Sequence, residues 1–192
     1  TQARRVPVLA FSTDWTIANA NTAILGFLPF SQVARIVDFA AKRGGQRFAI
    51  LIPETPYGMA VAGAVRAALS QQRLPAAIEA RFNDKTLAAA AQTLAARQFD
   101  TLILPVGGTA LNSVTTILRQ NGVALSSLRV IGTGLWDDDP VARGGVIDGA
   151  YYAAPDPAKR AKFVQRYQNV YGAKPPRLST LANVQRVGLE GA

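Results

Sequence analysis

Polar side chains follow the first apolar run of this sequence, at the positions where a strand would end. Ser12, Thr13, Asp14 and Trp15 come directly after the run at 6–11. Hydroxyl groups and backbone amides at such a position can bind a carboxylate or a sugar hydroxyl, and a nearby indole ring can cover the ligand. Ser12 and Thr13 therefore predict a site for a small polar ligand, although a strand-ending turn or a helix cap would explain the same two residues.

Tyr57 is the second candidate for ligand contact. It stands just before Gly58, where a helix is expected to begin. There its ring could cover a ligand while its hydroxyl donates a hydrogen bond, and packing of the ring at the mouth of the loop is the alternative. Trp136 belongs to a polar loop at 133–139 that follows a later apolar run, and we expect it to line the same site.

Glycines after two later apolar runs raise the question of a phosphate-binding loop. Gly107-Gly108 follows one run, and Gly132-Thr133-Gly134 ends another. Neither segment completes the pattern Gly-x-Gly-x-x-Gly or leads into Gly-Lys-Ser or Gly-Lys-Thr, so we expect no nucleotide. The run Asp137-Asp138-Asp139 lacks the alternate spacing, the glycine and the closing glutamate of a calcium loop. It predicts a capped turn before Pro140, with no metal.

The composition removes most catalytic chemistry. The 192 residues include no cysteine and no histidine, so disulfides, thiol nucleophiles, the usual zinc ligands and the commonest general base are all absent. No Gly-x-Ser-x-Gly elbow is present, and only chemistry by paired carboxylates stays open. We therefore expect a protein that is not an enzyme and has no cofactor.

The charge balance is basic, because 21 Lys and Arg residues face 12 Asp and Glu residues and give a formal net charge of +9. These basic residues are spread along the chain, and no cluster of basic and aromatic residues accompanies them, so we expect no nucleic-acid partner. The longest apolar runs, such as 48–53 and 101–106, are far shorter than the roughly 20 residues that cross a bilayer. The sequence therefore predicts no membrane span.

The elements that must position these residues alternate along the chain, and this alternation is typical of βαβ units and a parallel sheet. The fold class is therefore α/β. Ligands of such sheets bind at the carboxyl ends of the strands, where the candidate residues stand. We expect strands at 6–11, 47–52, 76–82, 101–105, 129–132 and 146–153, an extended crossing at 23–28, and helices at 31–43, 59–69, 84–97, 109–121, 156–171 and 179–189.

Six segments of the chain, in this order, resemble a known family. They are Val6-Pro-Val-Leu-Ala-Phe-Ser-Thr13, Phe27-Leu-Pro-Phe-Ser-Gln32, Phe48-Ala-Ile-Leu-Ile-Pro-Glu-Thr-Pro-Tyr-Gly58, Phe99-Asp-Thr-Leu-Ile-Leu104, Ile131-Gly-Thr-Gly-Leu-Trp-Asp137 and Phe163-Val-Gln-Arg-Tyr167. Together the segments are similar to the leucine/isoleucine/valine-binding branch of the type I periplasmic binding proteins. The resemblance runs along essentially the whole chain.

This resemblance implies a two-lobed architecture of parallel, Rossmann-like sheets in which the N-terminal part of the first lobe is missing. Residues 1–29 would be the remnant of the first lobe and a hinge, and residues 30–150 would form the second lobe. Residues 151–192 would form the return hinge and helices packed on the first lobe. We expect a fragment of a longer periplasmic protein, whose signal or lipoprotein segment preceded the start of this chain.

The resemblance also implies a function. Members of the family bind an amino acid between the lobes and deliver it to the membrane subunits of an ABC importer. Ser12 and Thr13 match the loop that binds the α-carboxylate, and Tyr57 matches a second-lobe tyrosine. Gly134 stands where amino-acid binders place an acidic residue for the ammonium group, and Gly107 stands where they place an aromatic residue. Binding of an ordinary amino acid would then need Asp14 or Asp137 as the counter-charge.

Two other functions stay open at this point. The run Gly132-Thr-Gly-Leu-Trp-Asp137 also resembles the penicillin-binding-protein activator lipoproteins, whose type I domain contacts a peptidoglycan synthase. The effector-binding domain of LacI-like repressors shares the same fold. The expected partners are thus a small, amino-acid-like ligand and an ABC transporter, or alternatively a peptidoglycan synthase.

Overall fold

The computed structural model describes residues 6–10, 17–24, 29–137, 147–154, 157–173 and 185–187. Its main body is a six-stranded sheet in the order β4-β3-β5-β6-β7-β8, in which every neighbouring pair is parallel. The strands are β3 (Phe48–Pro53), β4 (Ile78–Phe82), β5 (Thr101–Leu104), β6 (Arg129–Gly132), β7 (Tyr151–Ala153) and β8 (Gln185–Val187). The predicted α/β fold with parallel strands is therefore confirmed.

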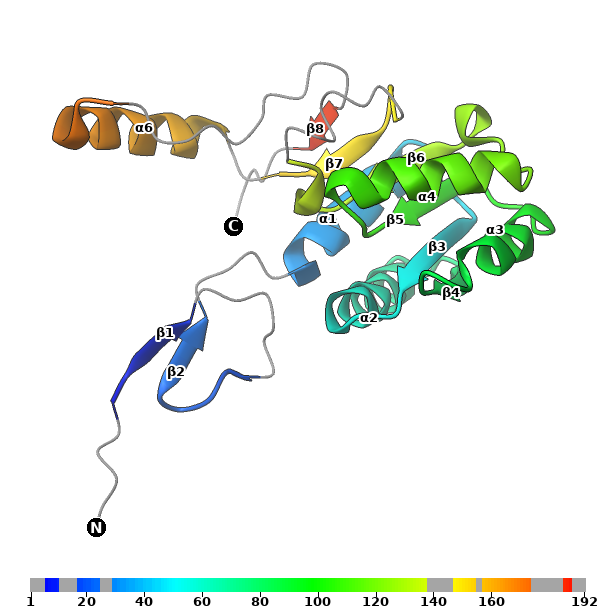
Figure 1. The fold of residues 1–192 in the computed structure, drawn as a ribbon, viewed down its shortest axis with the longest axis horizontal. Coiled ribbons are helices and arrows are strands. Elements are labelled where there is room, and N and C mark those ends of the chain that lie inside the picture. The colour runs from blue at the N-terminus through cyan, green and yellow to red at the C-terminus, as the bar shows by residue number, and fades with distance from the viewer. Residues whose placement is uncertain are drawn as a thin grey trace, which may run out of the picture.

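Helices cover both faces of this sheet (Figure 1). They are α1 (Pro29–Lys42), α2 (Pro56–Gln71), α3 (Leu87–Ala95) and α4 (Gly108–Gln120), with short 3₁₀ turns η2 (Leu125–Ser127) and η3 (Gly134–Trp136) on either side of β6. Helices α2, α3 and α4 connect the successive strands from β3 to β6, because parallel neighbours need a crossover.

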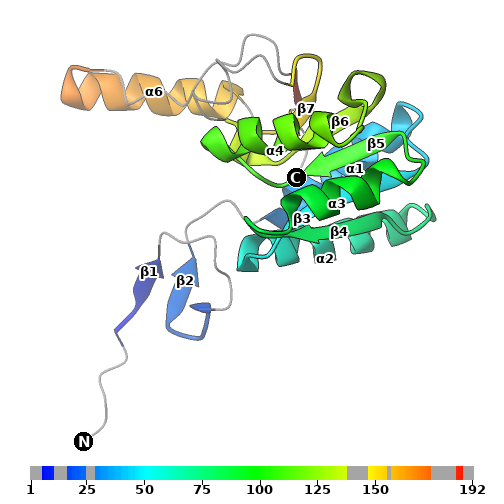
Figure 2. The same cartoon turned by 45° about the vertical axis from the view of Figure 1, so that its right-hand side comes forward.

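Strand β3 shows how the sequence builds two cores. Its apolar residues alternate, so that Phe48, Ile50 and Ile52 pack with α1 and α2 on one face, whereas Ala49 and Leu51 pack with α3 and α4 on the other. A strand buried on both faces is continuously apolar, which is why the run at 47–52 predicts it correctly. In Figure 2, α3 and α4 lie on the opposite side of the sheet from α1.

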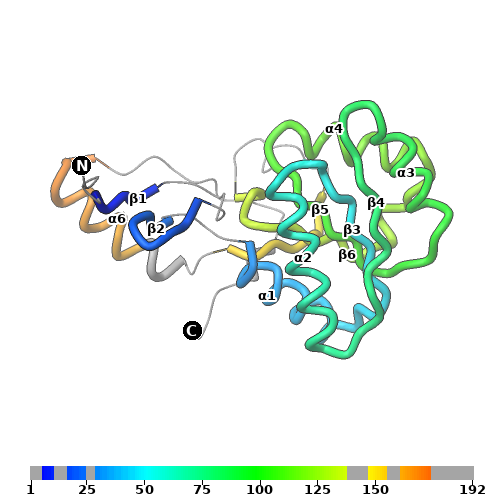
Figure 3. The backbone as a smooth tube through the Cα atoms, turned by 90° about the horizontal axis from the view of Figure 1, so that it is seen from below, coloured from blue at the N-terminus to red at the C-terminus, as the bar shows by residue number. Residues whose placement is uncertain are grey.

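A second, two-stranded sheet stands apart from the main body. Strand β1 (Val8–Ala10) pairs in parallel with β2 (Thr22–Ile24). Helix α6 (Pro157–Tyr171) lies at the same end of the molecule (Figures 1 and 3). Both elements expose large apolar side chains, among them Leu9 at 66% and Tyr171 at 67% of their surfaces.

Most predicted elements occur within a few residues of their expected positions, and the predicted apolar face of α1, with Val33, Ile36, Val37 and Ala40, is buried. One prediction is wrong in kind. The helix expected at 179–189 is not formed where the structure describes that segment, because Gln185–Val187 is a strand that pairs with β7. The few apolar residues of such a short segment do not distinguish a helix from a strand when a neighbouring strand edge is available for pairing.

Two boundaries also differ from the predictions. The strand expected at 146–153 is limited to Tyr151–Ala153, because residues 147–149 form a turn that ends at Gly149 with a φ of +81°. Asp84 does not cap α3. Thr86 is the N-cap residue instead, and the side chains of Asn83 and Thr86 accept the backbone N–H groups of this turn.

Candidate functional site

The carboxyl ends of β3, β5 and β6 lie at one edge of the main sheet, and each leads through a short loop into a helical turn. The loops contribute Thr55 to Tyr57, Gly107, and Thr133 to Gly134. In Figures 1 and 2 this edge points toward the end of the molecule that carries β1, β2 and α6. We refer to it as the carboxyl edge. It is the place where open parallel sheets bind ligands.

Tyr57 is held at the carboxyl edge by the start of α2. Thr55 has the extended backbone of an N-cap residue, and its Oγ1 accepts the N–H of Gly58 at 3.1 Å. Pro56 follows at the first turn, where its missing N–H costs no hydrogen bond. This cap fixes the direction of the Tyr57 side chain, whose ring packs against the core between α1, α2 and the sheet.

The Tyr57 hydroxyl donates to Thr133 Oγ1 at 2.8 Å and so joins the loop after β3 to the loop after β6. Thr133 has no exposed surface. Burial raises the pKa of Tyr57 above its ordinary value of 10.0, and the hydrogen bond with Thr133 offsets part of that rise. At neutral pH the site therefore contains an uncharged phenol.

Gln32 belongs to the same site, and it was not among the predicted site residues. It lies on α1 with only 4% of its surface exposed, and its Oε1 accepts the N–H of Gly134 at 3.0 Å. A signal was present in the sequence. Gln32 stands one turn before Ile36 and so places an amide on the apolar face of the helix, where a polar group needs a partner.

The two glycines of the predicted site are required by close packing. A Cβ at Gly107 would lie 2.6 Å from the carbonyl oxygen of Leu135. A Cβ at Gly134 would lie 3.0 Å and 3.1 Å from the two terminal amide atoms of Gln32. An aromatic side chain at 107 would not fit without displacing the neighbouring loop, and a side chain at 134 would press on Gln32. Both residues can thus contribute only backbone groups.

We expected Trp136 to line the ligand site, but it is buried in the core and does not line the carboxyl edge. Its side chain has no exposed surface, and its Nε1–H donates to the carbonyl of Val106 at 2.8 Å. The ring lies directly against Gly132, where a Cβ would overlap it. An indole with an available carbonyl partner is stable in a core, so the role of Trp136 is to hold the loops after β5 and β6 together.

The four residues Ser12, Thr13, Asp14 and Trp15 lie outside the described residues. Asp137 is described, and its Oδ1 accepts the hydroxyl of Tyr152 at 3.2 Å. No group of three or more acidic, histidine or cysteine side chains that could hold a metal occurs in the described ranges. Within those ranges no helix is long and apolar enough to cross a membrane.

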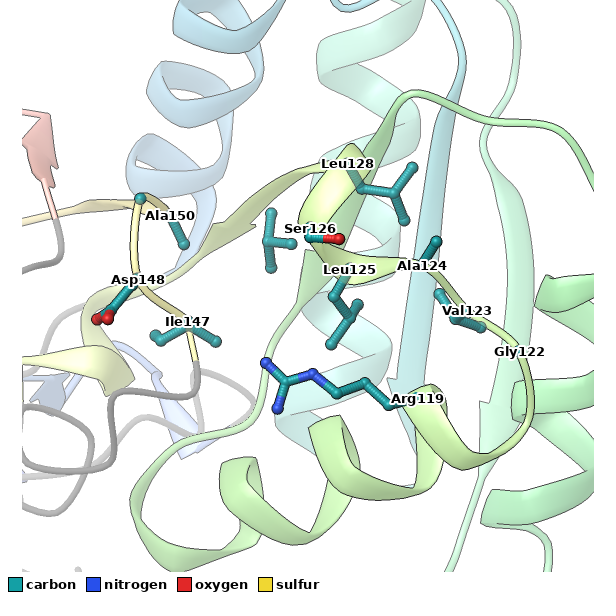
Figure 4. A pocket seen from close by; sticks show the side chains of 12 residues that line it. Arg119, Gly122, Val123, Ala124, Leu125, Ser126, Leu128, Ile147, Asp148 and Ala150 are labelled. Atoms are coloured by element: carbon teal, nitrogen blue, oxygen red, sulfur yellow. The ribbon is translucent and has the colours of Figure 1, made fainter.

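Two cavities lie at the opposite edge of the sheet, near the amino ends of its strands. One has a volume of about 660 Å³ and lies between the end of α4, η2 and the turn before β7. In Figure 4 the Arg119 side chain extends from α4 toward Ile147. The other, of about 310 Å³, begins beside it and reaches Arg47. Neither is lined by a predicted site residue.

A parallel sheet covered by helices on both faces, with a buried polar cluster at its carboxyl edge, is an α/β architecture of the kind that binds ligands at that edge. A sequence profile described as "Periplasmic binding protein" matches residues 1–187. The chain therefore belongs to the periplasmic binding protein family, and its fold is of type I. No curated protein matches the sequence closely enough to count as a relative.

Solved structures with the same fold include three informative ones. A solute-binding protein of an ABC transporter from Rhodopseudomonas palustris, in complex with 3,4-dihydroxybenzoic acid, is 20% identical, with a TM-score of 0.62 over 89% of this chain and 50% of that one. A putative branched-chain amino acid ABC transporter protein from Rhodospirillum rubrum is 17% identical, with a TM-score of 0.64 over 91% and 53%. LpoA of Haemophilus influenzae is 16% identical, with a TM-score of 0.54 over 73% and 26%.

The chain spans about half the length of the two solute-binding proteins. At these identities the likeness shows the fold, which is a solute-binding one, and leaves the ligand to be inferred from the site.

Proposed function

We propose that this chain is part of an extracytoplasmic solute-binding receptor that binds an amino acid or a similar small polar ligand for an ABC importer. The observation that carries the proposal is the buried polar cluster of Tyr57, Thr133 and Gln32 at the carboxyl edge of a periplasmic binding protein fold. The cluster consists of two hydroxyls and one amide, all neutral hydrogen-bonding groups, and its chemistry is that of holding a ligand.

The proposal includes the division of the chain into lobes. Residues 30–150 would be the second lobe, with a first-lobe remnant at 1–29 and a return hinge with a packing helix at 151–192. The separation of β1 and β2 from the main sheet supports this division. The carboxyl edge would then face Ser12, Thr13, Asp14 and Trp15 across the cleft. A periplasmic location, with the ABC membrane subunits as partner, follows from the same proposal.

Isothermal titration calorimetry tests this function. The full chain, and the same chain extended at its N-terminus to complete the first lobe, would be titrated with leucine, with 4-methyl-2-oxopentanoate and with 4-hydroxybenzoate. Saturable heat with one of them is the expected result. Absence of heat with all three in the extended chain would contradict a receptor for such solutes.

A second candidate function is that of a penicillin-binding-protein activator module. The specific observation in its favour is at Gly134 and Gly107, where packing leaves no room for the acidic and aromatic side chains of an amino-acid receptor. A fold neighbour, the C-domain of Haemophilus influenzae LpoA, is described as a regulator of PBP1A. Retention of a purified peptidoglycan synthase by the immobilised chain, together with no calorimetric signal for any solute, would select this function.

A further inference from the structure

The side-chain amide of Gln32 is held in one orientation. Its Oε1 accepts the N–H of Gly134 at 3.0 Å, which only the oxygen end of the amide can do. The Nε2 end therefore carries two N–H donors. Among the residues that the structure describes, neither donor has a hydrogen-bond partner. Only 4% of the surface of Gln32 is exposed, so the donors are also shielded from water.

A second unused donor lies at Thr133, the residue before Gly134 in the chain. The hydroxyls of Tyr57 and Thr133 share one hydrogen bond of 2.8 Å. Two hydroxyls carry two protons, and one such bond uses one of them, whichever group donates. The other proton has no acceptor in the described part of the chain. Thr133 is fully buried, so water does not reach its hydroxyl from the surface.

Residues 133 and 134 thus bring together two groups of neutral donors at the end of β6. Buried donors without acceptors are rare in native proteins because they lose their hydrogen bonds to water. Their presence indicates a site whose acceptor is supplied from outside the described residues. Gly134 keeps the amide of Gln32 open to that acceptor, because any Cβ at this position would lie 3.0–3.1 Å from the amide atoms.

We propose that Gln32 is a specificity-determining residue whose Nε2 group donates to an oxygen acceptor of the ligand, with Thr133 and Tyr57 supplying a second donor. The inference rests on the proposed function, and it specifies the ligand. The solute carries a carbonyl or carboxylate oxygen at the end that faces the second lobe. A 2-oxo or dicarboxylic acid fits this polarity, whereas the ammonium group of an amino acid would bring donors to donors.

One pair of probes differs only in the group at C2. 4-Methyl-2-oxopentanoate and leucine share a carbon skeleton and a carboxylate, and differ in a 2-oxo group that accepts hydrogen bonds or a 2-ammonio group that donates them. In calorimetry on the chain with a complete first lobe, the oxo acid should bind more tightly than leucine by a factor of about 10 or more. Glutarate, with a second carboxylate, should also bind.

The variant Gln32→Glu tests the residue directly. It keeps the acceptor for the Gly134 N–H and replaces the Nε2 donors with a second carboxylate oxygen. The affinity for the oxo acid should fall by about 10- to 100-fold, and the affinity for leucine should rise, because the ammonium group gains a counter-charge. Gln92→Glu is the matched control. Gln92 is exposed on α3 and contacts Asn121, so the same charge change there should leave both affinities unaltered.

The apolar variant Gln32→Met provides a readout without ligand. It removes the Nε2 donors together with the acceptor of the Gly134 N–H, so the thermal unfolding midpoint should fall only by what the loss of one hydrogen bond implies, while binding of the oxo acid is lost. A large fall in the midpoint together with retained binding of the oxo acid would identify Gln32 as purely structural and overturn the inference.

The two levels of the proposal fail in different ways. If the wild type binds a probe and Gln32→Glu binds all probes with unchanged affinity, the assignment of Gln32 is wrong and the receptor function stands. If the wild type binds none of the probes, the receptor function for such solutes is wrong, and the assignment of Gln32 falls with it.

Discussion

At the scale of single residues, the site depends on three polar side chains that three separate elements bring to one place. Tyr57 comes from the capped start of α2, Thr133 from the end of β6, and Gln32 from α1. None of them is charged at neutral pH. Their contribution to recognition is therefore the direction of hydrogen bonds, which favours discrimination between ligands more than raw affinity.

Replacement of Tyr57 should separate binding from folding. Tyr57→Phe removes the hydroxyl and keeps the ring in the core, so ligand affinity should fall by about 10-fold, and the free energy of unfolding should fall by about 1 kcal/mol. Tyr57→Ala should weaken binding further without unfolding the chain. Calorimetry and urea denaturation measure the two effects, and a variant that is unstable yet binds normally would contradict a role in the site.

Alkaline titration should find Tyr57 as a late-titrating tyrosine. Burial raises its pKa in the folded protein above the ordinary 10.0. The neutral form is thus favoured by folding, so the associated stability is present below pH 10 and is lost as the pH rises through the raised pKa. The ultraviolet absorbance of tyrosinate measures the titration of Tyr57, and Tyr57→Phe is the control that lacks the late step. Thr133→Val should shift that step to still higher pH, because the hydrogen bond between Tyr57 and Thr133 lowers the pKa of Tyr57.

At the scale of elements, the loops after β5 and β6 form one packed unit. Gly107 lies against Leu135, the Trp136 indole donates to Val106, and the same ring covers Gly132. Each contact joins one loop to the other or to the strand between them. The geometry of the carboxyl edge is thus a property of the pair of loops.

Two glycine substitutions should have opposite effects. Gly107→Ala places a Cβ 2.6 Å from a backbone oxygen that cannot move alone, and should lower the free energy of unfolding by about 1–3 kcal/mol. Gly63→Ala, in the middle of α2, meets nothing within 4 Å, and should raise it by about 0.5–1 kcal/mol through better helix propensity. Chemical denaturation measures both. A Gly107→Ala variant as stable as the wild type would contradict the prediction, because it would show that the loop around Leu135 can move without loss of stability.

The elements also show how far the sequence determines the structure. The apolar runs of β3 and β5 and the periodic face of α1 are long or strongly patterned, and they predict the sheet and its helices. The segment at 179–189 has no such pattern of its own, so the neighbouring strand β7 decides the state of Gln185–Val187. The same limit applies to the site. Tyr57 can be named from its place before a helix, whereas the burial of Trp136 and the contact of Gln32 with Gly134 depend on tertiary packing.

At the scale of the whole molecule, the elements differ in how much of their apolar surface is buried by tertiary packing. The main sheet has an apolar core on each face, whereas α6 exposes Phe163, Val170 and Tyr171 over more than half of their surfaces, at 55%, 72% and 67%. The aromatic rings of α6 contact one another along one face, with Phe163 and Tyr167 at 5.9 Å and Tyr167 and Tyr171 at 4.5 Å between centroids. The helix is thus supported mainly by its own contacts.

Native-state hydrogen exchange should reflect this difference. Amides of β3 and β5 should exchange only through global unfolding, and those of α6 should exchange by local opening with a much smaller free energy. If the proposed first lobe covers the helix, the same chain with that lobe added should show greater protection of α6. Protection of α6 equal to that of β3 in this chain would contradict a helix without tertiary support.

The interlocked loops at the end of the sheet have a consequence for how such a receptor can change its preference. Because Leu135 fills the space that a side chain at position 107 would need, a bulkier residue on one loop would be tolerated only after a compensating change on the other. Evolution or an engineer would then have to exchange both loops together as a single cassette. A library that varies one position at a time would sample few of the folded alternatives.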